Sequence, residues 1–109
     1  MTRFSETLAR LAATIAARQG ADPASSYTAK LLAGGPPLAA KKFGEEAVET
    51  VIAALQGDPD ALAAESADLI YHWLVPLAAS GLDLDAVAAK LEAREGRSGL
   101  DEKASRPKD

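Results

Sequence analysis

Residues 41–74, KKFGEEAVETVIAALQGDPDALAAESADLIYHWL, contain the pattern that decides the fold. Apolar residues recur at helical spacing on both sides of the short segment GDP at 57–59. Glycine commonly ends a helix, aspartate caps the start of the next one, and proline fits the first helical turn. We therefore expect two long helices joined by a tight turn, which makes them antiparallel neighbours.

The rest of the chain predicts shorter helices and no strand. The first 20 residues carry apolar residues at helical spacing and reach a stop signal at Gly20. Two further helices are expected, over YTAKLLA at 27–33 after a capping serine, and over LDAVAAKLEARE at 84–95 after Asp83. The composition is 48% hydrophobic, and about half of these residues are alanine, the strongest helix former. The predicted fold is an all-α antiparallel helical bundle.

Composition excludes several classes of protein. The chain has no cysteine, so disulfides, thiolate metal sites and cysteine nucleophiles are ruled out. A net charge of −4 argues against a nucleic-acid partner, which usually requires a basic face. No segment has the ~20 apolar residues of a membrane span or the apolar core of a signal peptide. We expect a soluble, cytoplasmic protein with no membrane partner.

The predicted domain is small and leaves apolar surface without cover. We expect one all-α domain at 1–96 and an extended tail at 97–109, because the tail has no apolar period. In a single copy, four apolar residues would remain exposed: Ile52, Tyr71, Trp73 and Leu74. Exposed apolar patches of this kind mark interaction sites. We therefore predict a homodimer that completes a four-helix core.

Two pairs of acidic residues lie on the two long helices. Glu46 and Glu49 precede the turn, Glu65 and Asp68 follow it, and both pairs border the predicted buried face. At ~1.5 Å per residue the two pairs reach similar distances from the turn. Carboxylates gathered near an apolar core repel unless a cation lies among them, and oxygen ligands suit Mg²⁺ or Mn²⁺. The alternative is a solvated acidic surface on a non-catalytic helical dimerisation module.

Two segments, GEEAVETVIAA at 44–54 and ESADLIYHWLV at 65–75, resemble the MazG-like all-α nucleoside-triphosphate pyrophosphohydrolases. The metal motif of that superfamily is E-x-x-E, a spacer, and then E-x-x-D. SYTAKLL at 26–32, KKFGEEAVE at 41–49 and REGRSGLDEKASR at 94–106 are similar to one family within it, phosphoribosyl-ATP pyrophosphohydrolase. The tail carries the more specific part of this resemblance, because it does not belong to the metal motif.

The resemblance implies an enzyme of histidine biosynthesis, at its second step. Water would cleave the α–β phosphoanhydride of 1-(5-phosphoribosyl)-ATP and release pyrophosphate and 1-(5-phosphoribosyl)-AMP. The enzymatic alternative is a house-cleaning pyrophosphohydrolase of free dNTPs with the same metal site.

The resemblance also assigns residues to roles. The implied ligands of Mg²⁺, or of Mn²⁺, are Glu46, Glu49, Glu65 and Asp68. The implied catalytic residues are Glu45, Glu46 and Glu49, of which Glu45 would bind a second metal ion or orient the attacking water. Basic residues are candidates for holding the substrate phosphates: Lys30, Lys42, Arg94, Arg97, Lys103 and Arg106. The alternative for Lys30 and Lys42 is that they are surface cations without this role. His72, the only histidine, is expected to pack or to lie at the surface rather than to bind metal.

Overall fold

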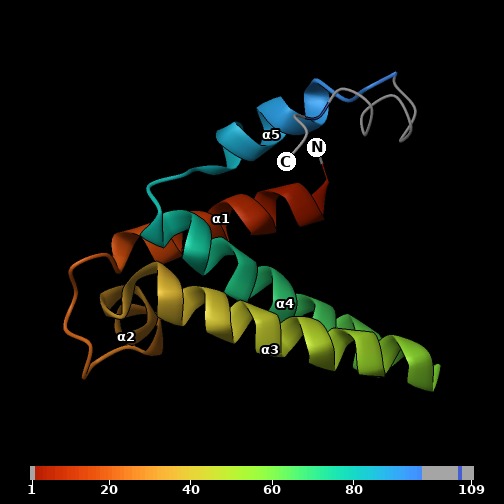
Figure 1. The fold of residues 1–109 in the computed structure, drawn as a ribbon, viewed down its shortest axis with the longest axis horizontal. Coiled ribbons are helices and arrows are strands. Elements are labelled where there is room, and N and C mark those ends of the chain that lie inside the picture. Colours follow the sequence, from red (N-terminus) through yellow and green to blue (C-terminus); the bar gives the residue numbers. More distant parts are fainter. Residues whose placement is uncertain (1, 97–105, 107–109) are drawn as a thin grey trace.

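The structure is a computed structural model that describes residues 2–96 and residue 106. Within this part the chain forms five helices and no strand: α1 (Arg3–Ala17), α2 (Tyr27–Ala33), α3 (Gly35–Gln56), α4 (Pro59–Ala79) and α5 (Leu84–Glu92) (Figure 1). The prediction of an all-α fold is confirmed. None of the helices in the described part is long and apolar enough to cross a membrane, and the cytoplasmic location stays a prediction.

The two long helices, α3 and α4, form an antiparallel hairpin and lie side by side (Figure 1). Gly57 ends α3 in the left-handed conformation, with φ of 74°, which glycine adopts without steric cost. The Asp58 carboxylate accepts hydrogen bonds from the N–H groups of Asp60 (3.0 Å) and Ala61 (3.2 Å), and Pro59 is the first residue of α4. Gly57, Asp58 and Pro59 therefore make the turn that the sequence predicts.

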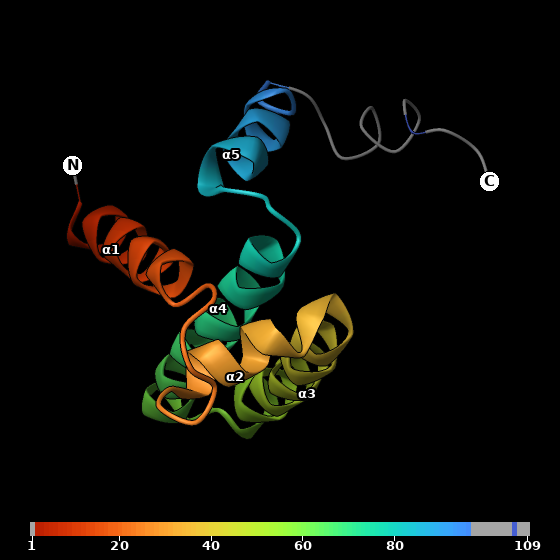
Figure 2. The same cartoon turned by 90° about the vertical axis from the view of Figure 1, so that its left-hand side faces the viewer.

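The shorter helices bury one end of this hairpin. α1 packs on α4, and α2 packs against both α3 and α4 (Figure 2). The Ser26 hydroxyl caps α2 by accepting a hydrogen bond from the N–H of Ala29 at 3.2 Å. The buried core lies where these helices meet and consists of Ile15, Leu31, Leu32, Ala39, Leu74 and Val75. α5 follows an extended link after α4 and stands apart from α2 and α3 (Figure 2).

The exposed apolar surface differs in part from the prediction. Leu74 was expected to lack cover, but it is only 3% exposed, because α1 and α2 both pack near this end of α4. Tyr71 and Trp73 are partly buried against the same core. Ile52 does remain exposed, as predicted, and it belongs to a line of four apolar residues on α3 that we call the α3 stripe: Val48 (59% exposed), Val51 (58%), Ile52 (49%) and Leu55 (83%).

Candidate functional site

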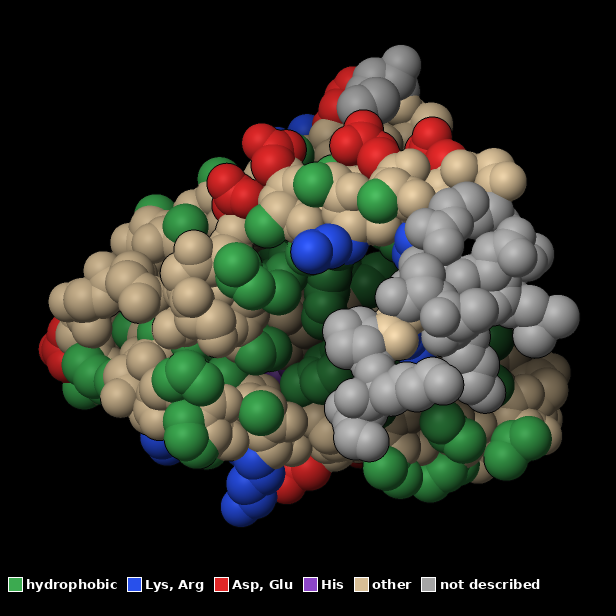
Figure 3. All heavy atoms as spheres, turned by 45° about the horizontal axis from the view of Figure 1, so that its top comes forward, with side chains coloured by type: hydrophobic (Ala, Val, Ile, Leu, Met, Phe, Trp, Pro, Cys, Tyr) green, Lys and Arg blue, Asp and Glu red, His purple; other side chains and the backbone are tan. Residues whose placement is uncertain are grey.

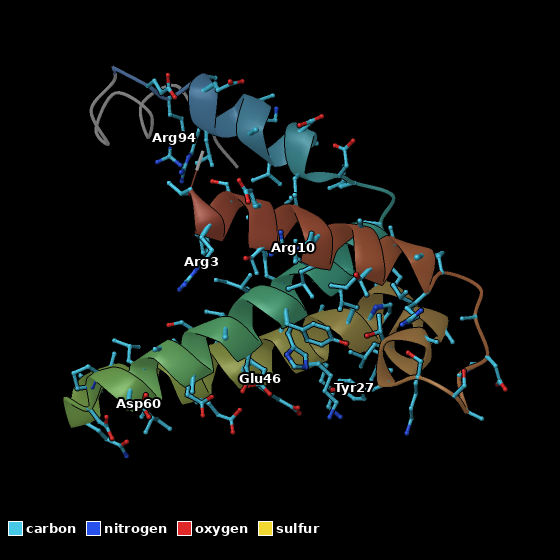
Figure 4. The ribbon with its side chains drawn as sticks, turned by 180° about the vertical axis from the view of Figure 1, so that it is seen from behind. Arg3, Arg10, Tyr27, Glu46, Asp60 and Arg94 are labelled. Atoms are coloured by element: carbon cyan, nitrogen blue, oxygen red, sulfur yellow. The ribbon has the colours of Figure 1, made fainter. Side chains whose placement is uncertain are left out.

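Three acidic side chains from the two long helices converge. Glu46 and Glu49 on α3 and Glu65 on α4 each offer a carboxylate oxygen, and these oxygens all lie within 4.8 Å of one another. Glu46 and Glu65 are half-buried and Glu49 is exposed. Figure 4 shows Glu46 on the side of the hairpin opposite α1. We call these three residues the acidic cluster; the structure thus brings together three of the four acids that the sequence predicts as metal ligands.

The electrostatics of the acidic cluster reflect crowded negative charge. The pKa of Glu46 is raised above its ordinary value, first by burial and then by the hydrogen bond and the charge of Glu49. The charge of Asp68 raises this pKa further, whereas His72 lowers it. Asp68, the fourth predicted ligand, is exposed and lies outside the group of three, although it is near enough to act on Glu46.

The chemistry of the acidic cluster suits a hard divalent cation. Its donors are carboxylate oxygens, which are the usual protein ligands of Mg²⁺ and Mn²⁺. A cation among them would compensate the repulsion by Glu49 and Asp68, which adds to the effect of burial on the pKa of Glu46. The residues present therefore fit an ion of this class.

The sequence model of the family described as phosphoribosyl-ATP pyrophosphohydrolase matches residues 8–95, a segment that contains the whole acidic cluster. The chain belongs to this family. It is 70% identical to a phosphoribosyl-ATP pyrophosphatase from Caulobacter sp. (strain K31), over 98% of this chain and 99% of the relative. It is 62% identical to a phosphoribosyl-ATP pyrophosphatase from Parvibaculum lavamentivorans, over 97% of each chain.

Lys42 and Glu45, two further residues predicted for the site of this phosphoribosyl-ATP pyrophosphohydrolase family member, form an ion pair with each other. The Lys42 ammonium lies 3.3 Å from a carboxylate oxygen of Glu45, one turn along α3. Glu45 is therefore engaged in an ion pair beside the acidic cluster rather than within it. The pKa of Tyr27 is raised above its ordinary value, first by burial; the charge of Lys42 opposes this rise, and the charge of Glu46 adds to it. Lys42 and Tyr27 thus lie in the surroundings of the cluster.

The other basic residues that are predicted to bind substrate phosphates lie in different parts of the chain. Lys30 lies exposed in the last turn of α2. Arg94 follows α5 and lies beyond α1 from Glu46 (Figure 4). Arg97 and Lys103 lie outside the described residues, and only Arg106 of the predicted tail is described. Arg94 and Glu46 therefore lie on opposite sides of α1 (Figure 4), and a contact of Arg94 with the substrate stays a prediction.

A buried histidine links α2 to the acidic part of α4. His72 is 8% exposed, and its Nδ1 lies 2.8 Å from the backbone carbonyl oxygen of Asp68. In the neutral imidazole the hydrogen on Nδ1 is donated to this carbonyl, so that Nε2 accepts the hydroxyl hydrogen of Tyr27 at 3.2 Å. His72 therefore packs in the interior, as expected. The sequence does not predict its contact with Tyr27, because the two residues are 45 positions apart.

Thr50 is a second residue near the acidic cluster that the sequence does not single out. Its hydroxyl oxygen lies 2.9 Å from the carbonyl oxygen of Glu46 and 3.2 Å from the carbonyl oxygen of Glu65. The first contact follows from the spacing of four residues on one helix, which is common for threonine. The second contact joins α3 to α4, and no local pattern in the sequence predicts it.

Two pockets lie at different parts of the surface. One of about 290 Å³ adjoins the acidic cluster and is lined by Glu49, Glu65 and four residues toward the turn: Ile52, Ala53, Gln56 and Ala61. The other, of about 330 Å³, lies between α1, α4 and the start of α5 and is lined mainly by alanine and leucine. Hydrophobic side chains also gather around a hollow on the face seen in Figure 3. Of these two pockets, the one beside the acidic cluster is lined by carboxylates that could hold a cation for phosphate chemistry.

Proposed function

We propose that this chain hydrolyses 1-(5-phosphoribosyl)-ATP to 1-(5-phosphoribosyl)-AMP and pyrophosphate, the second step of histidine biosynthesis. The observation that carries the proposal is the acidic cluster of Glu46, Glu49 and Glu65 within a chain of this family. Relatives that share 62–70% of its residues over nearly their whole length bear the name phosphoribosyl-ATP pyrophosphatase.

The proposed reaction needs positioning and charge compensation more than covalent catalysis. Glu46, Glu49 and Glu65, joined by Asp68, would hold Mg²⁺, or alternatively Mn²⁺. When bound, such an ion neutralises charge on phosphate oxygens and lowers the pKa of a bound water molecule. Glu45 would accept a hydrogen bond from the attacking water or assist a second ion. The ammonium of Lys42, which pairs with Glu45 in the structure, would contact a substrate phosphate.

The other substrate contacts in the proposal come from basic residues. Lys30 and Lys42 would hold phosphate groups from the side of α2 and α3. We propose that the tail at 97–109 follows the domain at 1–96 and supplies Arg97, Lys103 and Arg106 to the triphosphate and the separate 5-phosphate. Charge-assisted hydrogen bonds from such residues are roughly twice as strong as neutral ones.

A comparison of substrates tests the proposed activity. The purified protein with Mg²⁺ is expected to release pyrophosphate from phosphoribosyl-ATP with a kcat/KM at least ~100-fold above that for any dNTP, which corresponds to about 2.7 kcal/mol of transition-state discrimination. Product analysis by chromatography and a pyrophosphate assay would measure both. Equal rates on dNTPs would favour the house-cleaning alternative. Absence of hydrolysis together with absence of metal binding would favour the non-catalytic module.

We also propose that the α3 stripe is covered by a second copy of the chain. Its four apolar residues are 49–83% exposed and follow one face of a helix whose opposite side packs on α4. Burying such a patch against its own copy is the commonest way to form a soluble oligomer. Two of the three residues of the acidic cluster, Glu46 and Glu49, lie on the same helix as this stripe.

The expected result is a homodimer at micromolar concentration, measured by light scattering. Val51→Asp should shift the protein toward monomer, because a charge in the interface would lose its hydration. Leu91→Asp is the matched control, since Leu91 on α5 is also 58% exposed but lies outside the α3 stripe. A folded wild-type monomer at these concentrations would contradict the proposal.

A further inference from the structure

Thr50 donates one hydroxyl hydrogen toward two backbone carbonyl groups on different helices. Its oxygen lies 2.9 Å from the carbonyl oxygen of Glu46, one turn earlier on α3, and 3.2 Å from that of Glu65 on α4. A threonine hydroxyl has a single hydrogen, so the two carbonyls share it. The contact with Glu65 requires the helices to approach closely, which the small and buried Ala53, one turn further along α3, permits.

Both carbonyl groups belong to residues of the acidic cluster. Thr50 contacts the backbone of the two residues that carry these carboxylates. The distance between the Glu46 and Glu65 carboxylates, and their alignment along the helix axes, therefore depend in part on this contact. The covalent link between the helices is the turn at Gly57, which lies further from the cluster along α3 than Thr50 does. A metal site needs its ligands held within about 0.5 Å of their working positions.

We propose that Thr50 is a positioning residue that sets the metal affinity of the acidic cluster by holding α3 and α4 at the level of Glu46 and Glu65. The inference rests on the proposed metal-binding role of those carboxylates. Thr50 uses its hydroxyl on the backbone and contributes no ligand itself. Groups that orient ligands from outside the ligand set commonly change metal affinity by 10–100-fold when they are removed.

The test is calorimetric titration of the full-length protein with Mn²⁺, which reads metal binding without catalysis. Thr50→Val keeps the shape of the side chain and removes the donor. We expect the Kd for Mn²⁺ to rise about 10-fold or more. Thr50→Ser restores the hydroxyl and should return the Kd to within about 3-fold of the wild-type value, about 0.65 kcal/mol in binding free energy.

Thr14→Val is the matched control. The Thr14 hydroxyl donates to the carbonyl oxygen of Arg10 at 2.9 Å, the same four-residue contact that Thr50 makes within its helix. Thr14 lies exposed on α1, away from the acidic cluster. This variant removes the same contact within a helix and should leave the Kd for Mn²⁺ unchanged, so it separates the loss of a local hydroxyl contact from the loss of positioning.

The outcomes distinguish this inference from the proposed function. If the wild type binds Mn²⁺ and folded Thr50→Val binds it equally well, the positioning role is wrong while the metal site stands. If the wild type binds no divalent ion, the metal site itself is wrong, and the role of Thr50 fails with it. Circular dichroism shows whether each variant is folded. If Thr50→Val does not fold, Thr50→Ala replaces it in the same titration, because alanine also lacks the hydroxyl.

Discussion

Replacing Glu49 with glutamine is expected to lower kcat/KM for phosphoribosyl-ATP by at least ~100-fold at saturating Mg²⁺. Glutamine keeps the size of the side chain and removes one of the three carboxylate charges of the acidic cluster. A bound metal ion contributes several kcal/mol of charge stabilisation in the transition state, so a weakened or displaced ion has a large effect on rate. Steady-state assays over a range of Mg²⁺ concentrations would measure the loss.

The same substitution should not destabilise the metal-free protein. Glu49 is a principal cause, after burial, of the raised pKa of Glu46. A carboxyl group whose pKa is higher in the folded state makes folding less favourable at pH values above that pKa, where it must ionise among like charges. Glu49→Gln relieves this repulsion, so its melting temperature in EDTA at neutral pH should equal or exceed that of the wild type.

Glu92→Gln, which removes an exposed charge at the end of α5, is the control for both measurements. It should change neither activity nor its dependence on Mg²⁺. A Glu49→Gln enzyme with near-normal activity would contradict the proposed set of ligands. A large fall in melting temperature without metal would instead assign Glu49 a structural role.

Deleting residues 97–109 is expected to reduce kcat/KM for phosphoribosyl-ATP by about 10²- to 10⁴-fold. The deletion removes Arg97, Lys103 and Arg106. Each charge-assisted contact with a phosphate is worth roughly 1.5–3 kcal/mol, and the loss of two of them gives the stated range. The tail has no apolar period, so helicity measured by circular dichroism should be nearly unchanged. Hydrolysis of dNTPs, which lack the separate 5-phosphate, should fall much less.

The ratio of the two activities in the truncated protein decides what the tail does. If both substrates lose activity together, the tail has a structural role. If neither loses activity, the tail does not contact the substrate, and the dNTP alternative gains support. A triple substitution of Arg97, Lys103 and Arg106 by glutamine should reproduce the selective loss and would show that the charges, rather than the chain length, are responsible.

The helical hairpin could be predicted because its signals are local. The glycine, aspartate and proline at 57–59 each perform the function that their chemistry favours. Counting residues back from that turn places Glu46, Glu49 and Glu65 at a common level, and the structure brings their oxygens together. Asp68 was grouped with them by the same count, but it points from the exposed side of α4 and lies outside the group of three.

Contacts between segments far apart in the sequence could not be predicted. Leu74 was expected to need a partner chain, because a single apolar stripe on α4 was assumed; in the structure α1, α2 and α3 all pack on this helix and bury more than one of its faces. The contact of Tyr27 with His72 and that of Thr50 with Glu65 depend on how the helices approach one another. Neither follows from the spacing of residues within a helix.

The turn at Gly57 also limits how the length of this chain can vary during evolution. Adding one residue to either helix between the turn and its acids would shift those acids by ~1.5 Å along the axis and ~100° around it. Adding a full turn to both helices, about 7 residues in total, would restore the match. Homologues that keep this type of turn and both acid pairs should therefore differ in the spacer between Glu49 and Glu65 by steps of about 7 residues, and other insertions should occur outside it.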